Sequence, residues 1–211
     1  MNTIIQIAGT VPSSFFYYKL NKELQTFQIK KIASNSTSFF HALSTIYLGL
    51  IYFYTNKYAY LMQINTGGYF LFDLYYLIND GKYDLLRIMY FYHHIVLYPY
   101  LLISYKYHYW PQIIFFGELS NIPNYLVYYS LKNDEKKKLW KGYKSKKTKV
   151  LLRIQLYFYG FIRVLILGYY AYLEYHNPKL PKFVLSVLML YPFGLLWFFA
   201  MLKQYIYLKK Y

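Results

Sequence analysis

Residues 183–202 read FVLSVLMLYPFGLLWFFAML, a stretch without a single charged side chain. Residues 39–54, FFHALSTIYLGLIYFY, form a second long apolar run. About 18 or more apolar residues in a row are long enough to cross the hydrocarbon core of a bilayer. Several such runs in a chain of 211 residues leave little polar material for a water-facing surface. The sequence therefore predicts an integral membrane protein, and an all-α one, because an isolated span in lipid must satisfy its own backbone hydrogen bonds.

The composition points to the same class. Charged residues make up 15% of the chain, whereas a soluble domain carries about 25%, and apolar residues make up 57%. The absence of cysteine excludes disulfides, thiol catalysis and thiolate metal ligands. The net charge of +16 lies between and beside the apolar runs, and no nucleic-acid-binding module is recognisable. We therefore expect membrane lipid as a partner and no nucleic acid.

Hydropathy predicts six transmembrane helices, at about residues 37–55, 59–78, 85–104, 111–131, 150–173 and 183–206. The second of these is the least apolar, so we expect it to pack inside the bundle. Residues 1–36 are predicted to form a separate N-terminal segment, an interfacial or partly inserted helix. They are only partly apolar and lack the basic start of a cleaved signal peptide.

The distribution of lysine predicts the orientation. With six spans, seventeen lysines fall on the side of the termini and of the second and fourth loops, and four fall on the opposite side. Positive residues concentrate in cytoplasmic loops, so both termini are predicted to be cytosolic. The fourth loop is the most basic, with Lys136, Lys137, Lys138, Lys144, Lys146 and Lys147 among its lysines. This basic loop is predicted to anchor the topology, with contact to anionic lipid headgroups or to a phosphate-bearing cofactor as a further role.

Six polar residues fall inside the first five predicted spans, where a charged group is costly and needs a reason. They are His41, Asp73, His93, His94, Glu118 and Arg163. If each faces inward, they converge on one polar centre. His93 and His94 are adjacent, so on a helix they point about 100° apart. One could therefore reach a substrate as acid, base or nucleophile, while the other bonds a neighbouring helix.

The acidic residues have several possible partners. Asp73 could orient a histidine, accept a proton or pair with Arg163. Glu118 and Arg163 carry opposite charges on different spans and could form a structural ion pair. No metal site is expected, because two adjacent histidines are a poor spacing for ligands on one helix face.

These residues resemble, in order and spacing, those of the TLC domain family. The resemblance rests on SFFHA at 38–42, GYFLFDL at 68–74, HHI at 93–95, E-x-S-x-x-P at 118–123 and Arg163. It covers roughly residues 35–208, so a TLC-like domain is expected at 37–208. The resemblance implies a barrel-like bundle of six helices with a central cavity for a lipid chain. It also implies the endoplasmic reticulum or a related endomembrane, which would be a host membrane if the gene is viral.

The same resemblance implies two functions. Some family members are ceramide synthases, which carry a further His-Asp pair after the two histidines, whereas here no acidic residue lies between His94 and Glu118. The shorter members, linked to lipid sensing, transport or homeostasis, are more similar. We therefore expect a lipid-handling protein without a cofactor, in which His41, Glu118 and Arg163 form the polar centre of the cavity.

The alternative is an acyltransferase with acyl-CoA as co-substrate and with His93, His94 and Asp73 as catalytic residues. One histidine would deprotonate the acceptor or take the acyl group, and Asp73 would orient it. A channel or transporter is a third hypothesis, although the chain shows no repeated half.

Overall fold

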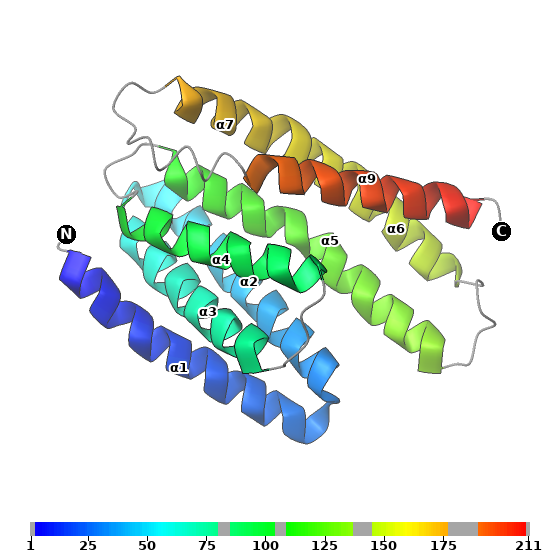
Figure 1. The fold of residues 1–211 in the computed structure, drawn as a ribbon, viewed down its shortest axis with the longest axis horizontal. Helices are drawn as coiled ribbons and strands as arrows, with labels where there is room; N and C mark the ends of the chain where they lie inside the picture. Colours follow the sequence, from blue (N-terminus) through cyan, green and yellow to red (C-terminus); the bar gives the residue numbers. More distant parts are fainter. Residues whose placement is uncertain (1–2, 80–84, 104–108, 137–144, 177–189, 210–211) are drawn as a thin grey trace.

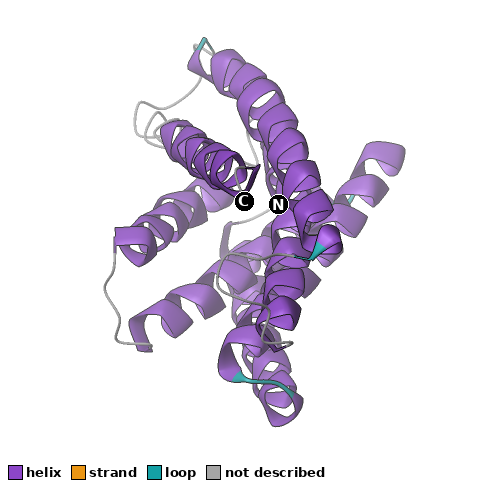
Figure 2. Cartoon of the chain, turned by 90° about the vertical axis from the view of Figure 1, so that its right-hand side faces the viewer, coloured by secondary structure: helices purple, strands orange, loops and turns teal. Residues whose placement is uncertain are grey.

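The computed structural model describes residues 3–79, 85–103, 109–136, 145–176 and 190–209. Every regular element in these ranges is a helix, as Figures 1 and 2 show, so the all-α prediction is confirmed. The elements are α1 (Thr3–Phe27), α2 (Lys30–Thr55), α3 (Ala59–Asn79), α4 (Leu85–Ile103), α5 (Trp110–Lys136), α6 (Lys146–Tyr159), the π-helical η2 (Gly160–Ile166), α7 (Leu167–Tyr175) and α9 (Leu190–Lys209). The segments α6, η2 and α7 follow one another without a break and form one long helix.

Each predicted span coincides with one of these helices. Residue 104 of the third span and residues 183–189 of the sixth span lie outside the described residues. Within the described ranges, one helix, Lys146–Leu173, is long and apolar enough to cross a membrane, with a mean hydropathy of 1.7. Only 28% of that apolar window is buried, and the rest is partly or fully exposed. The structure thus contains a candidate membrane-spanning helix, and the six-span arrangement stays a prediction.

The outward faces of the helices are apolar and several inward positions are polar. Exposed large side chains occur on many of the helices, among them Phe15, Leu50, Tyr92, Leu165 and Phe199. Buried polar residues include Thr37, His41, Thr45, Gln63 and Thr66. The interior also holds an apolar cluster that includes Met62, Phe70 and Leu101, so the helices bury polar and apolar side chains together while exposing large apolar ones.

Helix α5 joins the two halves of the molecule. It packs against α2 on one side and against α6 on the other. Helices α1 to α4 form the first half around α3, which contacts α1, α2 and α4. The prediction that the second span packs inside the bundle is therefore confirmed, and its residues Gln63, Thr66, Gly67 and Gly68 are buried.

Helix α1 belongs to this bundle. It runs beside α3 in the same direction, since Gly9 faces Ile64 and Tyr18 packs against Tyr75 further along both helices. The predicted boundary between residues 36 and 37 falls inside α2, which begins at Lys30. Residues 3–36 thus do not form a structural unit of their own.

The position of α1 changes the expected placement of the termini. The prediction that both termini share one side assumed that residues 1–36 stay outside the bundle. Helix α1 runs along the length of the bundle once more. The start of α1 and the C-terminal end of α9 therefore lie at opposite ends of the bundle (Figure 1). Lys30, Lys146 and Lys203 lie toward the end that holds the C-terminus, because α2 and α6 begin there and α9 ends there.

The seam between α1 and α3 depends on small residues. A Cβ added at Gly68 would lie 2.8 Å from the backbone nitrogen of Ser14 and would also overlap the Ser13 side chain. At Gly67 it would lie 2.7 Å from Cγ2 of Thr10. Small residues that let helix backbones approach closely are typical of helix pairs in membranes.

We predict that Gly68→Ala separates α1 from α3 and lowers stability by about 1–3 kcal/mol, the usual cost of overpacking. The measurement is thermal unfolding of the purified protein in detergent. Gly117→Ala is the matched control, because a Cβ there meets no heavy atom within 4 Å and alanine is the better helix former. Equal melting temperatures for Gly68→Ala and wild type would contradict the close seam.

We also predict that the N-terminus and the C-terminus lie on opposite sides of the membrane, with the C-terminus cytosolic. The measurement is protease accessibility of a tag at either end in sealed microsomes. Degradation of both tags would show that α1 stays on the cytosolic surface, as the sequence alone suggests.

Candidate functional site

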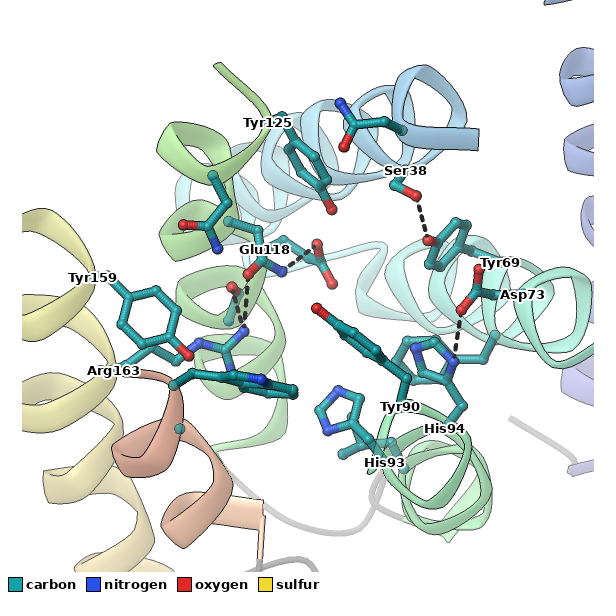
Figure 3. Close-up of a pocket in the computed structure, with 18 of the residues that line it drawn as sticks. Ser38, Tyr69, Asp73, Tyr90, His93, His94, Glu118, Tyr125, Tyr159 and Arg163 are labelled. Atoms are coloured by element: carbon teal, nitrogen blue, oxygen red, sulfur yellow. Dashed lines mark hydrogen bonds and ion pairs between the residues drawn. The ribbon is translucent and has the colours of Figure 1, made fainter. Parts of the chain in front are cut away.

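The bundle contains a partly open cavity of about 840 Å³ between its two halves. This volume lies within the range of about 300–1,000 Å³ found for small-molecule sites. Much of the lining is apolar or aromatic, including Phe70, Leu97, Ile113, Leu167, Trp197 and Met201. Polar side chains from α2, α3, α4, α5 and η2 complete the wall (Figure 3).

The first polar contact joins α3 to α4. Asp73 Oδ2 lies 3.1 Å from His94 Nδ1, and the His94 ring stacks on Phe70 with centroids 4.7 Å apart. The Asp73 carboxylate and the His94 ring are thus close enough to pair between α3 and α4. Of the partners considered for Asp73, the structure therefore places a histidine beside it, and His94 is the histidine that pairs with a carboxylate on a neighbouring helix.

His93 is placed differently. Its ring lines the cavity and lies edge-on to Phe70 and Trp197, with centroids 6.4 and 6.5 Å away. Its Nδ1 atom is buried and has no hydrogen-bond partner within the described part of the chain. Of the two adjacent histidines, His94 lies beside a carboxylate, whereas His93 lines the cavity with a buried Nδ1 that has no acidic neighbour among the described contacts.

His41 does not line the cavity, which differs from the prediction of a single converging set. It is completely buried behind the wall, where its ring stacks on Tyr69 at 4.0 Å. Its Nε2 lies 3.5 Å from Glu118 Oε1. His41 therefore supports Glu118 from behind, and Glu118 faces the cavity (Figure 3).

A hydrogen-bond network holds His41 in turn. Its Nδ1 lies 3.3 Å from the hydroxyls of both Tyr17 and Thr45. The Tyr17 hydroxyl donates to Asn65 Oδ1 at 2.6 Å, and Asn65 Nδ2 donates to Thr45 at 2.9 Å. Residues of α1, α2 and α3 thereby fix the ring that faces Glu118.

Arg163 belongs to the π-helical segment η2 and donates to α5. Its Nε donates to Ser120 Oγ at 2.7 Å, and its Nη2 donates to the Gly117 carbonyl at 3.1 Å and to Asn121 Oδ1 at 3.3 Å. The expected ion pair with Glu118 is not among these contacts. Instead Asn121 links the two residues, because its Nδ2 donates to Glu118 Oε2 at 3.4 Å.

Five of the six predicted residues therefore meet at the cavity wall. They are Asp73, His93, His94, Glu118 and Arg163. Two tyrosines that sequence reasoning missed, Tyr90 and Tyr125, direct their hydroxyls toward the middle of the cavity (Figure 3). With 32 tyrosines in the chain, nothing in the sequence singles out these two.

The basic loop is described only in part. Lys146 and Lys147 begin α6 and are exposed, and Lys136 ends α5. Lys137, Lys138 and Lys144 lie outside the described residues. Lys146 and Lys147 do not line the cavity, whereas Lys30 and Lys31 at the start of α2 do.

Within the described ranges, no three histidine or acidic side chains gather as metal ligands would. Comparison with family models, curated proteins and solved structures gives no match to this chain. The resemblance to the TLC domain therefore stays a prediction from the motifs.

We predict that Arg163→Lys lowers stability by about 2 kcal/mol. Lysine keeps the charge but lacks the planar fork that donates to three acceptors on α5, and hydrogen bonds from charged groups contribute about 1.5–3 kcal/mol. Thermal unfolding in detergent measures the change. Arg153→Lys is the matched control, because Arg153 is exposed on α6; an equal loss in both variants would contradict the role of the fork.

Proposed function

We propose that this chain is a multi-pass endomembrane protein that holds the acyl chain of a lipid in its central cavity. The observation that carries the proposal is a cavity of about 840 Å³ with largely apolar walls and a polar centre. A lipid combines the same two properties, an apolar chain and a polar end. The helices around the cavity also expose large apolar side chains, which suits a protein whose ligand comes from the bilayer.

The outer surface supports the membrane assignment. Monomeric soluble proteins rarely expose contiguous apolar patches larger than a few hundred Å². Here Val150, Ile154, Phe161 and Leu165 are all about half exposed along the candidate spanning helix. Six membrane spans, with the lysine-rich end in the cytosol, account for this apolar surface. Helix α1 adds a further helix to the six spans.

The motifs behind the TLC resemblance interlock around the cavity, which supports the family assignment. His41 of SFFHA faces Glu118 of E-x-S-x-x-P. Ser120 of the same motif accepts from Arg163. Asp73 of GYFLFDL faces His94 of HHI. Segments far apart in the sequence therefore form one site, and the endoplasmic reticulum or a related membrane follows from the resemblance.

We predict that the protein purified in mild detergent retains an acyl lipid, detected by native mass spectrometry and by lipid extraction. Gly117→Leu should reduce the retained lipid several-fold, because its side chain would extend into open cavity space. Gly117→Ala, with a smaller side chain, should retain more. Wild-type protein that carries no lipid would contradict the proposal.

A second candidate is an acyl-CoA-dependent acyltransferase, favoured by the free Nδ1 of His93 beside the Asp73–His94 pair. His93 would take the proton from an amine or hydroxyl acceptor. The acceptor would form a new bond to the acyl carbon, the thioester C–S bond would break, and the thiolate of CoA would leave and receive the proton.

For this candidate, we predict that His93→Ala removes one lipid class from the lipidome of an expressing cell. His176→Ala is the matched control, because His176 is exposed at the end of α7 and does not line the cavity. Lipidomes unchanged by His93→Ala, at equal protein level, would exclude the acyltransferase and leave lipid binding in place.

A further inference from the structure

The first turns of α2 present a strip of polar side chains to the cavity. The lining residues there lie at spacings that place them on one side of a helix, and they are Lys30, Lys31, Ser34, Asn35 and Ser38. Lys30 Nζ lies 5.3 Å from the centre of the Tyr76 ring on α3. The strip therefore begins between α2 and α3 and leads inward to the polar centre.

The two lysines occupy an electrostatically unfavourable position. They are the first two residues of a 26-residue helix, whose N-terminus carries a partial positive charge that favours anions. The first turn of α2 contains no acidic residue, and the N-cap Ile29 supplies no side-chain hydrogen bond. An anion at this point would interact favourably with the helix dipole and with both ammonium groups.

A second, independent observation lies one turn further into the cavity. The Nδ2 group of Asn35 is buried and has no hydrogen-bond partner within the described residues. The carboxylates that line the cavity, Asp73 and Glu118, each face a histidine. The wall near α2 thus offers donors, among them a buried amide that lacks an acceptor.

We infer that the start of α2 binds the phosphate of the ligand, with Lys30 and Lys31 on its oxygens and Asn35 donating from deeper in the wall. The inference rests on the proposed lipid-binding function and narrows its ligand to a phosphate-bearing acyl lipid. Lysine serves as a point-charge ligand for phosphate, and the apolar walls deeper in the cavity receive the chain. The headgroup then lies at the lysine-rich end of the bundle.

The test is thermal stabilisation of the full chain in neutral detergent by three probes: phosphatidic acid, diacylglycerol with the same acyl chains, and inorganic phosphate. A ligand that binds only the folded state raises the melting temperature with its concentration, which gives its affinity. We expect phosphatidic acid to bind at least tenfold more tightly than diacylglycerol. Lys30→Gln/Lys31→Gln should abolish this difference without weakening diacylglycerol.

Lys146→Gln/Lys147→Gln is the matched control. It removes the same charge, also from the first two residues of a long helix, but from residues that do not line the cavity. The control should keep the full preference for phosphatidic acid. If the first double variant does not fold, the single variant Lys31→Gln is used instead, because Lys31 is exposed. It should reduce the preference for phosphatidic acid over diacylglycerol several-fold.

The outcomes separate this inference from the function on which it rests. Equal binding of both lipids, or equal losses in the two double variants, would overturn the phosphate site and leave the lipid cavity intact. If inorganic phosphate alone stabilised the protein as much as phosphatidic acid does, the site would bind a free phosphate ion. That result would contradict a site for a lipid headgroup. No stabilisation by either lipid would contradict the proposed function itself.

Discussion

Two contacts between a carboxylate and a histidine hold the helices around the cavity. Asp73 faces His94 between α3 and α4, and Glu118 faces His41 between α2 and α5. A buried charge without a partner is strongly destabilising, and the loss of one partner from a buried pair costs about 3–5 kcal/mol. Each pair therefore restricts how its two helices pack, because any slide that parts the residues leaves a charge unpaired.

Arg163 imposes the same constraint on the other half of the bundle. A guanidinium inside an apolar helix must direct its donors to a neighbour, and α5 offers three acceptors within one turn, on Gly117, Ser120 and Asn121. The π-helical segment η2 alters the direction in which side chains around Arg163 leave the helix. Such π-helical turns are frequent at functional sites. Since α5 carries both Glu118 and the acceptors for Arg163, it positions the two halves of the cavity wall relative to each other.

Apolar runs and isolated polar residues were sufficient to predict the helices and most of the site. A charge within a span has few low-energy positions, so Asp73, Glu118 and Arg163 could be assigned to the interior from the sequence alone. Their partners could not, because the choice between histidine and arginine depends on helix rotation, which hydropathy does not determine. Tyr90 and Tyr125 were missed for another reason: tyrosine occurs throughout the chain, so its presence distinguishes no position.

The packing of α1 shows why low hydropathy alone does not place residues 1–36. Polar residues in α1 are matched by polar residues in α3, so a partly apolar helix can still pack within the bundle. Tyr17 is completely buried and donates to Asn65, beside the ring of His41. The same pairing allows both helices to be weakly apolar, since each covers the polar face of the other. Because His41 faces Glu118, α1 contributes to the geometry of the cavity wall without lining it, and the polar centre therefore depends on the whole chain from its first helix onward.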